Sequence, residues 1–275
     1  MFAFSGEGLL GRPLGAAGAV CVGVILLCAV FSPFVAPYDP IAIAPHLRLL
    51  PPGWAHLFGT DQLGRDVFSR VVAGSSVVMA LVGVSISVAL AAGVAGGLAA
   101  GYGGGVLGGT IMLLCDVVMT LPMMLCALAL ATVLGPGLVT VCVVITLFLA
   151  PGYARIVRAQ SQALVGLDYV VAARAMGAGA VRVMLRHLLP NMAGQLLVQV
   201  AMDVPTVIGI EVGMTFLGQG AEPPTPSWGS IVSDGFSYVR LAPHIVLAGS
   251  LPIVVATIGF TFLAEALRDV MDVRR

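Results

Sequence analysis

Three acidic residues, Asp116, Asp203 and Glu211, stand well inside long apolar stretches of the chain. An ionisable side chain at such a position costs free energy in lipid, so it generally lines a polar route or pairs with another group. In a carrier that works alone, these acids would form a proton relay. Alternatively, each acid pairs with a hydroxyl, a backbone group or an arginine at a helix interface. Because the acids do not repeat between two halves of the chain, as in many inverted-repeat carriers, we favour pairing.

Motifs of catalysis and of metal binding are absent from the sequence. The chain has no Gly-x-Ser-x-Gly, no His-Glu-x-x-His and no Gly-x-Gly-Asp. All thirteen basic residues are arginine, so the chain lacks the phosphate-binding lysine of a P-loop. The five cysteines and four histidines have no ligand-like spacing. We therefore predict that the protein is not an enzyme and holds neither a metal nor another cofactor.

The composition places these residues in a membrane protein. Hydrophobic residues make up 59% of the 275 positions and charged residues only 9%, whereas a soluble domain carries about 25% charge. So apolar a chain is not disordered. Nucleic acid is excluded as a partner, because the net charge is zero and no basic face is offered to phosphates. The lipid bilayer is the expected surrounding.

Six apolar runs are long enough to cross a bilayer, whose core of about 30 Å requires roughly 20 helical residues. A signal peptide is the alternative for the first run, but that run is too long and prolines occupy the place of a cleavage site. We therefore predict an all-α integral membrane protein with six transmembrane helices. The runs are Leu14–Ala36, Val77–Gly101, Thr110–Leu134, Leu138–Ala154, Met192–Gly218 and Pro243–Leu267.

The distribution of arginines predicts the orientation of these helices. Nine arginines fall on one side of the six runs and four on the other. Because cytoplasmic loops carry the excess of basic residues, both termini are expected in the cytoplasm. The segment 155–191 is then the largest cytoplasmic loop, and segments 37–76 and 219–242 are external. We divide the chain into residues 1–76, with the first helix and an external loop, and residues 77–275, with the other five helices.

Glycines recur every four residues along the second run and its exit. Small residues at this spacing let two helix backbones approach closely in lipid. A dinucleotide-binding loop is the alternative, but no strand precedes these glycines. We therefore predict helix packing for Gly93, Gly97, Gly101, Gly105 and Gly109.

The cytoplasmic loop 155–191 contains a short helix with signals at both ends. Asp168 suits an N-cap, the alanine-rich stretch Tyr169–Met176 favours about two helical turns, and Gly177 suits the left-handed position after a helix. Either this helix lies among the lipid headgroups, or it docks in a groove of a soluble protein. Its apolar residues share one face, which favours a partner: Tyr169, Val170, Ala173 and Met176.

The external segment from Gly59 to Asp66 is predicted to form an ordered cap. Thr60 and Asp61 can hydrogen-bond the turn, Gly64 permits a tight backbone, and Arg65 can reach neighbouring acids. Asp66 is placed to cap the helix that leads to Arg70. A folding role is favoured over a contact with substrate.

Four motifs resemble those of permease subunits of ABC importers. Val171-Ala-Ala-x-x-x-Gly177 and Leu189-Pro190 resemble the coupling loop of these permeases, although Val171 replaces the usual glutamate. Segments 58–70, 216–229 and 266–272 are similar to those of dipeptide, oligopeptide and nickel permeases. Leu113 departs from the arginine that relatives often place three residues before the equivalent of Asp116. The resemblance covers nearly the whole chain from Leu14 onward.

The resemblance implies a type I importer permease in a bacterial inner membrane. It implies a second, related permease subunit, two ATP-binding subunits that hydrolyse ATP, and an extracytoplasmic solute-binding protein. The substrates would be di- and oligopeptides; a nickel or metal-chelate permease is the alternative within the family, and the proton-coupled carrier is the alternative outside it. The residues expected to couple to the ATPase are Asp168, Tyr169, Val171, Ala172, Ala173, Arg174, Gly177, Leu189 and Pro190.

Overall fold

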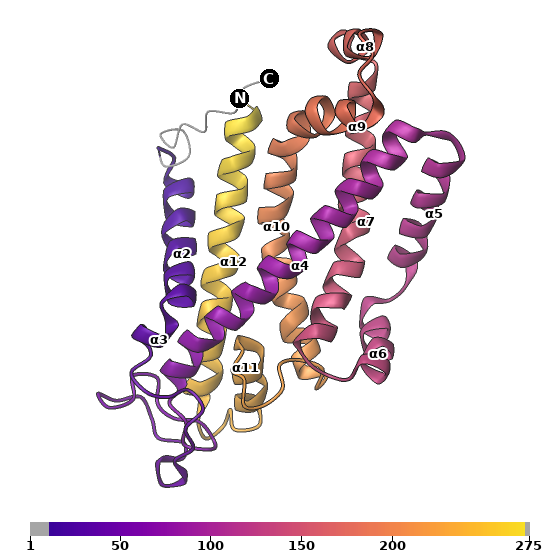
Figure 1. Cartoon of the computed structure of the whole chain (residues 1–275). Helices are drawn as coiled ribbons and strands as arrows, with labels where there is room; N and C mark the ends of the chain where they lie inside the picture. Colours follow the sequence, from indigo (N-terminus) through magenta and orange to yellow (C-terminus); the bar gives the residue numbers. More distant parts are fainter. Residues whose placement is uncertain (1–10, 273–275) are drawn as a thin grey trace. The chain divides into compact units, whose positions relative to one another are not determined.

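The computed structural model describes residues 11–272, which are almost entirely helical (Figure 1). Arg274 and Arg275, which the arginine count includes, lie outside these residues. Within the described range, the only strand-like feature is an isolated bridge between Thr60 and Asp66. Five helical stretches are long and apolar enough to cross a bilayer. They contain α2 (Pro13–Val30), α4 (Val67–Gly103), α7 (Leu138–Val165), α10 (Leu189–Phe216) and α12 (Pro243–Asp272).

The third predicted span is not one straight helix. It consists of α5 (Gly105–Thr120) and α6 (Met123–Leu134), which meet at a bend of 93°. Pro122 explains the break, because proline disfavours the helical conformation of the residue before it and has no N–H to donate. Leu121 is accordingly extended, with ψ 136°. The chain therefore has six spans only if this bent pair counts as one.

Several helices extend beyond the apolar runs that predicted them. α4 begins at Val67 rather than at position 77, and α7 continues past Arg155 to Val165. In the first run, α2 ends at Val30 and a separate turn of helix, α3 (Ser32–Val35), follows. Hydropathy detects only the part of a helix that is apolar, so it misses polar turns that continue the same helix. The predicted boundary at 76/77 falls inside α4, and the two-part division of the sequence stays a prediction.

The chain forms two compact units, each of which contains separate stretches of sequence. Unit 1 comprises residues 11–83, 130–141 and 201–272 of the described chain, and unit 2 comprises residues 84–129 and 142–200.

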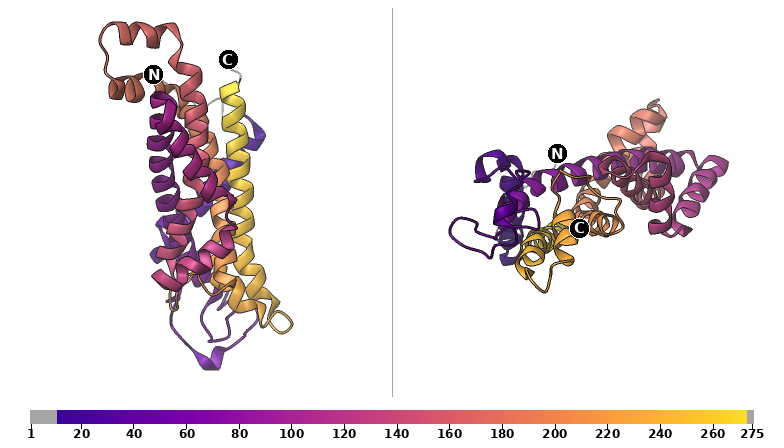
Figure 2. Two further views of the ribbon diagram at one scale, coloured as in Figure 1. Left: turned by 90° about the vertical axis from the view of Figure 1, so that its right-hand side faces the viewer. Right: turned by 90° about the horizontal axis from the view of Figure 1, so that it is seen from below.

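In unit 1, α2 lies alongside α12, as two views show (Figures 1 and 2). Glycines permit this close approach: a Cβ atom on Gly18 would lie 2.9 Å from the carbonyl oxygen of Gly259. Arg12, just before α2, forms an ion pair with Asp269 near the end of α12. α11 (Trp228–Phe236) also packs on α12, where a Cβ atom on Gly249 would lie 2.9 Å from Ile231 Cγ2. The start of α2 and the end of α12 therefore lie at one end of unit 1.

In unit 2, three of the predicted glycines bring α4 against α7. Cβ atoms on Gly93 and Gly97 would each lie 2.6 Å from a carbonyl oxygen of α7, and one on Gly101 would lie 3.0 Å from another. Gly105 and Gly109 do not belong to this contact. Both lie in α5, and added Cβ atoms there would meet nothing within 4 Å. The helix-packing prediction is confirmed for the first three glycines and wrong for the last two.

Gly97→Ala should lower the stability of the protein by about 1–3 kcal/mol, the usual range for an overpacked contact. The added methyl would meet backbone, the carbonyl oxygen of Ala154, which cannot rotate away. Gly96→Ala is the matched control, because its nearest contact would be 3.7 Å from Ile111 Cγ2. The thermal unfolding midpoint in detergent measures the difference. Equal midpoints for the two variants would contradict the packing argument.

Candidate functional site

The predicted coupling helix is present in unit 2 as α8 (Asp168–Ala175), which lies across the end of α7 (Figures 1 and 2). Asp168 is not its N-cap, contrary to the prediction. The cap is Leu167, whose carbonyl accepts hydrogen bonds from the backbone of Val170 and Val171. Asp168 instead occupies the first turn, where its negative charge is still favourable to the helix dipole.

Gly177 has φ +86° and ends α8 as predicted. Two backbone bonds close the turn: Ala178 N–H donates to the carbonyl of Ala173 at 3.0 Å, and Gly177 N–H to that of Arg174 at 2.9 Å. This pair of bonds is a Schellman motif, which satisfies carbonyls at the end of a helix and requires a left-handed residue. The turn therefore depends on the conformation of Gly177.

The predicted apolar face of α8 is divided between the chain itself and solvent. Val170 and Ala173 are buried within the protein. Tyr169, Val171 and Met176 are exposed, Met176 by 82%. Ala172 and Arg174 are also exposed, and the Arg174 guanidinium lies 5.1 Å from the centre of the Tyr102 ring. α8 thus presents an exposed surface that contains apolar side chains.

The return from α8 to α10 is helical but irregular. α9 (Ala180–Val183) continues into a π-helical turn, Met184–Leu188, and then into Leu189 and Pro190 at the start of α10. Pro190 has no N–H for a helical hydrogen bond, and its ring crowds the carbonyl four residues earlier. The wider π-helical turn accommodates this crowding. Asn191, which is not among the predicted coupling residues, donates from Nδ2 to the Tyr169 hydroxyl at 3.3 Å. This bond ties α8 to the start of α10.

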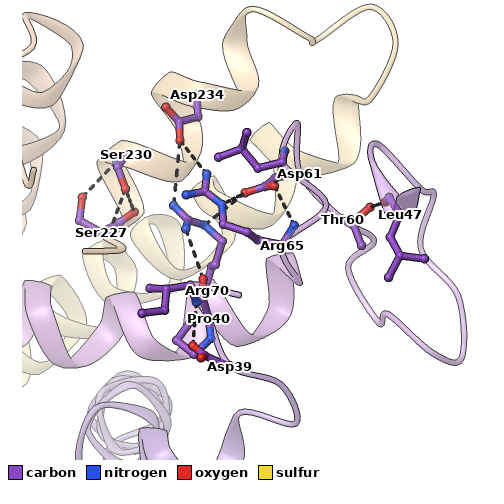
Figure 3. A network of polar contacts seen from close by, with 12 residues as sticks. Asp39, Pro40, Leu47, Thr60, Asp61, Arg65, Arg70, Ser227, Ser230 and Asp234 are labelled. Atoms are coloured by element: carbon purple, nitrogen blue, oxygen red, sulfur yellow. Dashed lines mark hydrogen bonds and ion pairs between the residues drawn. The ribbon is translucent and has the colours of Figure 1, made fainter. Parts of the chain in front are cut away.

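The predicted cap in unit 1 is an ordered, buried network (Figure 3). Asp61 Oδ1 accepts the backbone N–H groups of Leu63 and Arg65 at 2.8 and 2.9 Å, and Oδ2 accepts from Arg65 Nε at 2.6 Å. The Thr60 hydroxyl donates to the carbonyl of Leu47 and accepts from the backbone of Leu50. Thr60, Asp61, Arg65 and Asp66 are each less than 7% exposed.

The two glycines of the cap have left-handed backbones, with φ +72° at Gly59 and +76° at Gly64. A Cβ atom on Gly59 would also lie 2.8 Å from the His244 ring. Asp66 caps α4 as expected, because its Oδ2 accepts the N–H of Ser69 at 2.7 Å. Its Oδ1 lies 2.8 Å from Nδ1 of His56, a partner that the sequence did not indicate.

Arg70 and Asp234 complete the network, and neither was among the predicted cap residues. Arg70 is 3% exposed, its Nε lies 3.5 Å from Asp61, and its Nη1 donates to the carbonyl of Pro40 at 3.3 Å. Asp234 of α11 lies 3.4 Å from Arg65 Nη2 and 4.0 Å from Arg70 Nη2. Next to these side chains is a cavity of about 410 Å³. Only tertiary contacts could reveal Asp234, because 164 positions separate it from Arg70 in the chain.

Glu211 and Asp116, two of the predicted intramembrane acids, pair with side chains of the same unit. Glu211 is fully buried in unit 1, where Oε1 accepts from the Ser227 hydroxyl at 2.7 Å and the Thr215 hydroxyl at 3.1 Å. Asp116 forms an ion pair with Arg155 in unit 2. Arg155 therefore takes the place of the arginine that relatives often have at the position of Leu113. Asp203 is buried in α10. These contacts support pairing for Glu211 and Asp116.

Glu211 also holds the start of α11. Ser227 is the N-cap of α11 and forms a capping box with Ser230. The Glu211 carboxylate lies so close that a Cβ atom on Gly229 would be 2.8 Å from its Oε2. A carboxylate at a helix N-terminus is favourable because the helix dipole is positive there. Glu211 therefore orients the helix that carries Asp234.

The fold has a counterpart among solved structures. It is similar to that of a chain in the structure described as inward-facing conformations of the MetNI methionine ABC transporter, with a TM-score of 0.58 and 20% identity. The likeness covers 73% of this chain and 96% of that one.

Sequence comparison defines the family. Residues 92–275 match the model for "binding-protein-dependent transport system inner membrane component", and residues 9–52 match "N-terminal TM domain of oligopeptide transport permease C". The chain belongs to this family of inner membrane components, the permeases of ABC importers.

Two relatives span nearly the whole chain. The di/tripeptide transport system permease protein DppC of Pseudomonas aeruginosa is 35% identical over 261 residues, 93% of this chain and 86% of the relative. The glutathione transport system permease protein GsiD of Shigella flexneri is 36% identical over 255 residues, 92% and 84% of the two chains. The resemblance found in the sequence motifs is thus confirmed.

Proposed function

We propose that this chain is one of two different permease subunits of an ABC importer for di- and oligopeptides. The observation that supports it most is the match to both family models together with relatives named for di/tripeptide and glutathione transport. The partners are a second permease subunit, two ATP-binding subunits and an extracytoplasmic solute-binding protein. ATP hydrolysis takes place on the ATP-binding subunits, since this chain has no P-loop lysine.

The exposed surface of α8 is the proposed contact with an ATP-binding subunit. Closure of the ATPase dimer pulls on this helix, and the Schellman turn and the bond from Asn191 to Tyr169 transmit the movement to α10. The two permeases then alternate between inward-open and outward-open states. This alternation depends on a coupling free energy between the distant sites for ATP and for the transported substrate. This chain supplies half of the translocation route.

Transport by the assembled importer tests the proposal. The chain, a second permease and two ATP-binding subunits from the same operon are reconstituted in liposomes that contain ATP, and the binding protein is added outside with a radiolabelled dipeptide. We expect uptake that requires ATP and the binding protein. Uptake by this chain alone, driven by a proton gradient, would instead support the carrier.

Both termini are proposed to be cytoplasmic, and the cap external. The arginine count supports this orientation, and the ion pair between Arg12 and Asp269 supports a common side for both ends. A cysteine at the fully exposed Trp54 should be labelled in spheroplasts by a membrane-impermeant maleimide, whereas one at the exposed Met176 should react only after permeabilisation. The five native cysteines are replaced first. Labelling of position 176 in intact spheroplasts would contradict the orientation.

A further inference from the structure

The cavity beside the cap combines two buried cations with a weakly held anion. Arg65 and Arg70 both line it, and they are only 6% and 3% exposed. Asp61 fixes them from behind through their Nε atoms, at 2.6 and 3.5 Å. Their Nη2 atoms are directed to Asp234 (Figure 3), at 3.4 and 4.0 Å. These long distances contrast with the short bond to Asp61.

Asp234 is also accessible to solvent, because its side chain is 42% exposed. A half-exposed pair at such distances contributes little stability, commonly 0.2–1 kcal/mol. Without Asp234, the two buried guanidiniums would face one buried carboxylate, Asp61, so this cluster of side chains would carry an excess positive charge. Guanidinium groups bind carboxylates with well-defined geometry. The position of Asp234 is therefore one that a carboxylate from a ligand could take over.

The remaining walls of the cavity suit a small zwitterion. Its volume of about 410 Å³ lies in the range of small-ligand pockets, roughly 300–1,000 Å³. Glu222 lines the same cavity and can receive an ammonium group, and Ser230, Ser233 and Thr225 offer hydroxyls. A single cavity thus offers partners for both charged ends of a short peptide.

We propose that this cavity is a binding site for the C-terminal carboxylate of a peptide, which replaces Asp234 as the ligand of Arg65 and Arg70. The proposal rests on the proposed function, since it assigns an entry site to the same peptide. Asp61 is a positioning residue that holds the two guanidiniums in place. Asp234 occupies the site when no peptide is present.

Protection of a cysteine from labelling tests the site directly. Ser233→Cys is made in a chain whose native cysteines are replaced, and the assembled importer is placed in nanodiscs without binding protein. A thiol reagent is then applied alone, with dialanine, with dialanine amide, or, in a separate arm, with added unliganded binding protein. We expect dialanine to slow labelling at position 233 and the amide, which has no carboxylate, to leave the rate unchanged. Phe236→Cys, on the same helix but not in the cavity wall, is the control and should be labelled equally in all conditions.

Asp234→Asn provides the second variant. Removal of either arginine would disturb the buried network, so a loss of binding could not be distinguished from a loss of folding. Asp234 is half-exposed, and its replacement disturbs the network less. Loss of its competing charge should tighten protection by dialanine by about 1.4- to fivefold, the fold-change that corresponds to a half-exposed ion pair. A purely structural Asp234 would leave the protection constant unchanged or weaken it.

Several outcomes would overturn the proposal: no protection by dialanine, equal protection by the amide, unchanged or weaker protection in Asp234→Asn, or protection only by unliganded binding protein. The last result would assign the cavity to a protein contact. Peptide uptake is measured in parallel. Normal uptake without protection would refute the site and leave the proposed function standing. Protection without uptake of any peptide would refute the peptide importer and leave a carboxylate site.

Discussion

Gly177→Val should uncouple the importer while the chain remains inserted and assembled. The Schellman turn after α8 requires a left-handed backbone at this position, φ +86°, which costs about 1–2 kcal/mol for a residue with a Cβ atom and more for a β-branched one. An added Cβ atom would meet nothing within 4 Å, so the penalty comes from the backbone and not from a clash. Because 1.4 kcal/mol is a factor of ten, ATPase stimulation by loaded binding protein should fall about tenfold.

Two controls separate this conformational effect from a change in size or surface. Gly179 has φ −66° and equally open surroundings, so Gly179→Val should change stimulated hydrolysis little. Gly177→Asn should be milder than Gly177→Val, because asparagine tolerates the left-handed region better. Normal stimulated hydrolysis in Gly177→Val, with wild-type subunit stoichiometry, would remove α8 as the coupling helix.

Asp61→Ala should prevent stable accumulation of the chain. This carboxylate accepts two backbone N–H groups and the Nε of Arg65, and it also faces Arg70. Its loss leaves two buried guanidiniums without their principal counter-charge, and breaking a buried ion pair costs about 3–5 kcal/mol. The amount of chain in the membrane and its unfolding midpoint in detergent measure the effect.

Asp39→Ala is the matched control for this second prediction. Asp39 also lies in the segment between α3 and α4, and its side chain accepts one backbone bond, from Ile41 at 3.0 Å, but it is exposed to solvent. The variant should accumulate almost as well as the wild type, because surface substitutions usually change stability by less than about 0.5 kcal/mol. If Asp61→Ala had a normal midpoint and only transport failed, the folding role of Asp61 would be wrong.

The sequence alone determined most of the helical architecture and the end of α8. Apolar runs located five continuous spans, because the length of a helix in lipid is set by the thickness of the bilayer. The turn at Gly177 was also predictable, since glycine is the residue that adopts φ +86° without strain. These features depend on residues that are close to one another in the chain. The same holds for Asp66 at the start of α4.

Predictions from neighbouring residues were wrong where a break in a helix or a contact with a distant segment determines the structure. Composition could not show that Pro122 divides the third span, or that Leu167 and not Asp168 caps α8, because both depend on where a helix actually begins and ends. Gly105 and Gly109 fit the same spacing as Gly93, but α5 carries them away from the contact with α7.

The cap shows most clearly which contacts the sequence alone could not predict. Its motif identified Asp61 and Arg65, whose contact spans four residues, but neither Arg70 as a second guanidinium nor Asp234 as their shared partner. Asp234 reaches them because Glu211 and Ser227 fix the start of α11, and α11 packs on α12. Charge pairing acts through space rather than along the chain. Only the tertiary structure could therefore bring Asp234 to the two arginines, with which it lines one cavity.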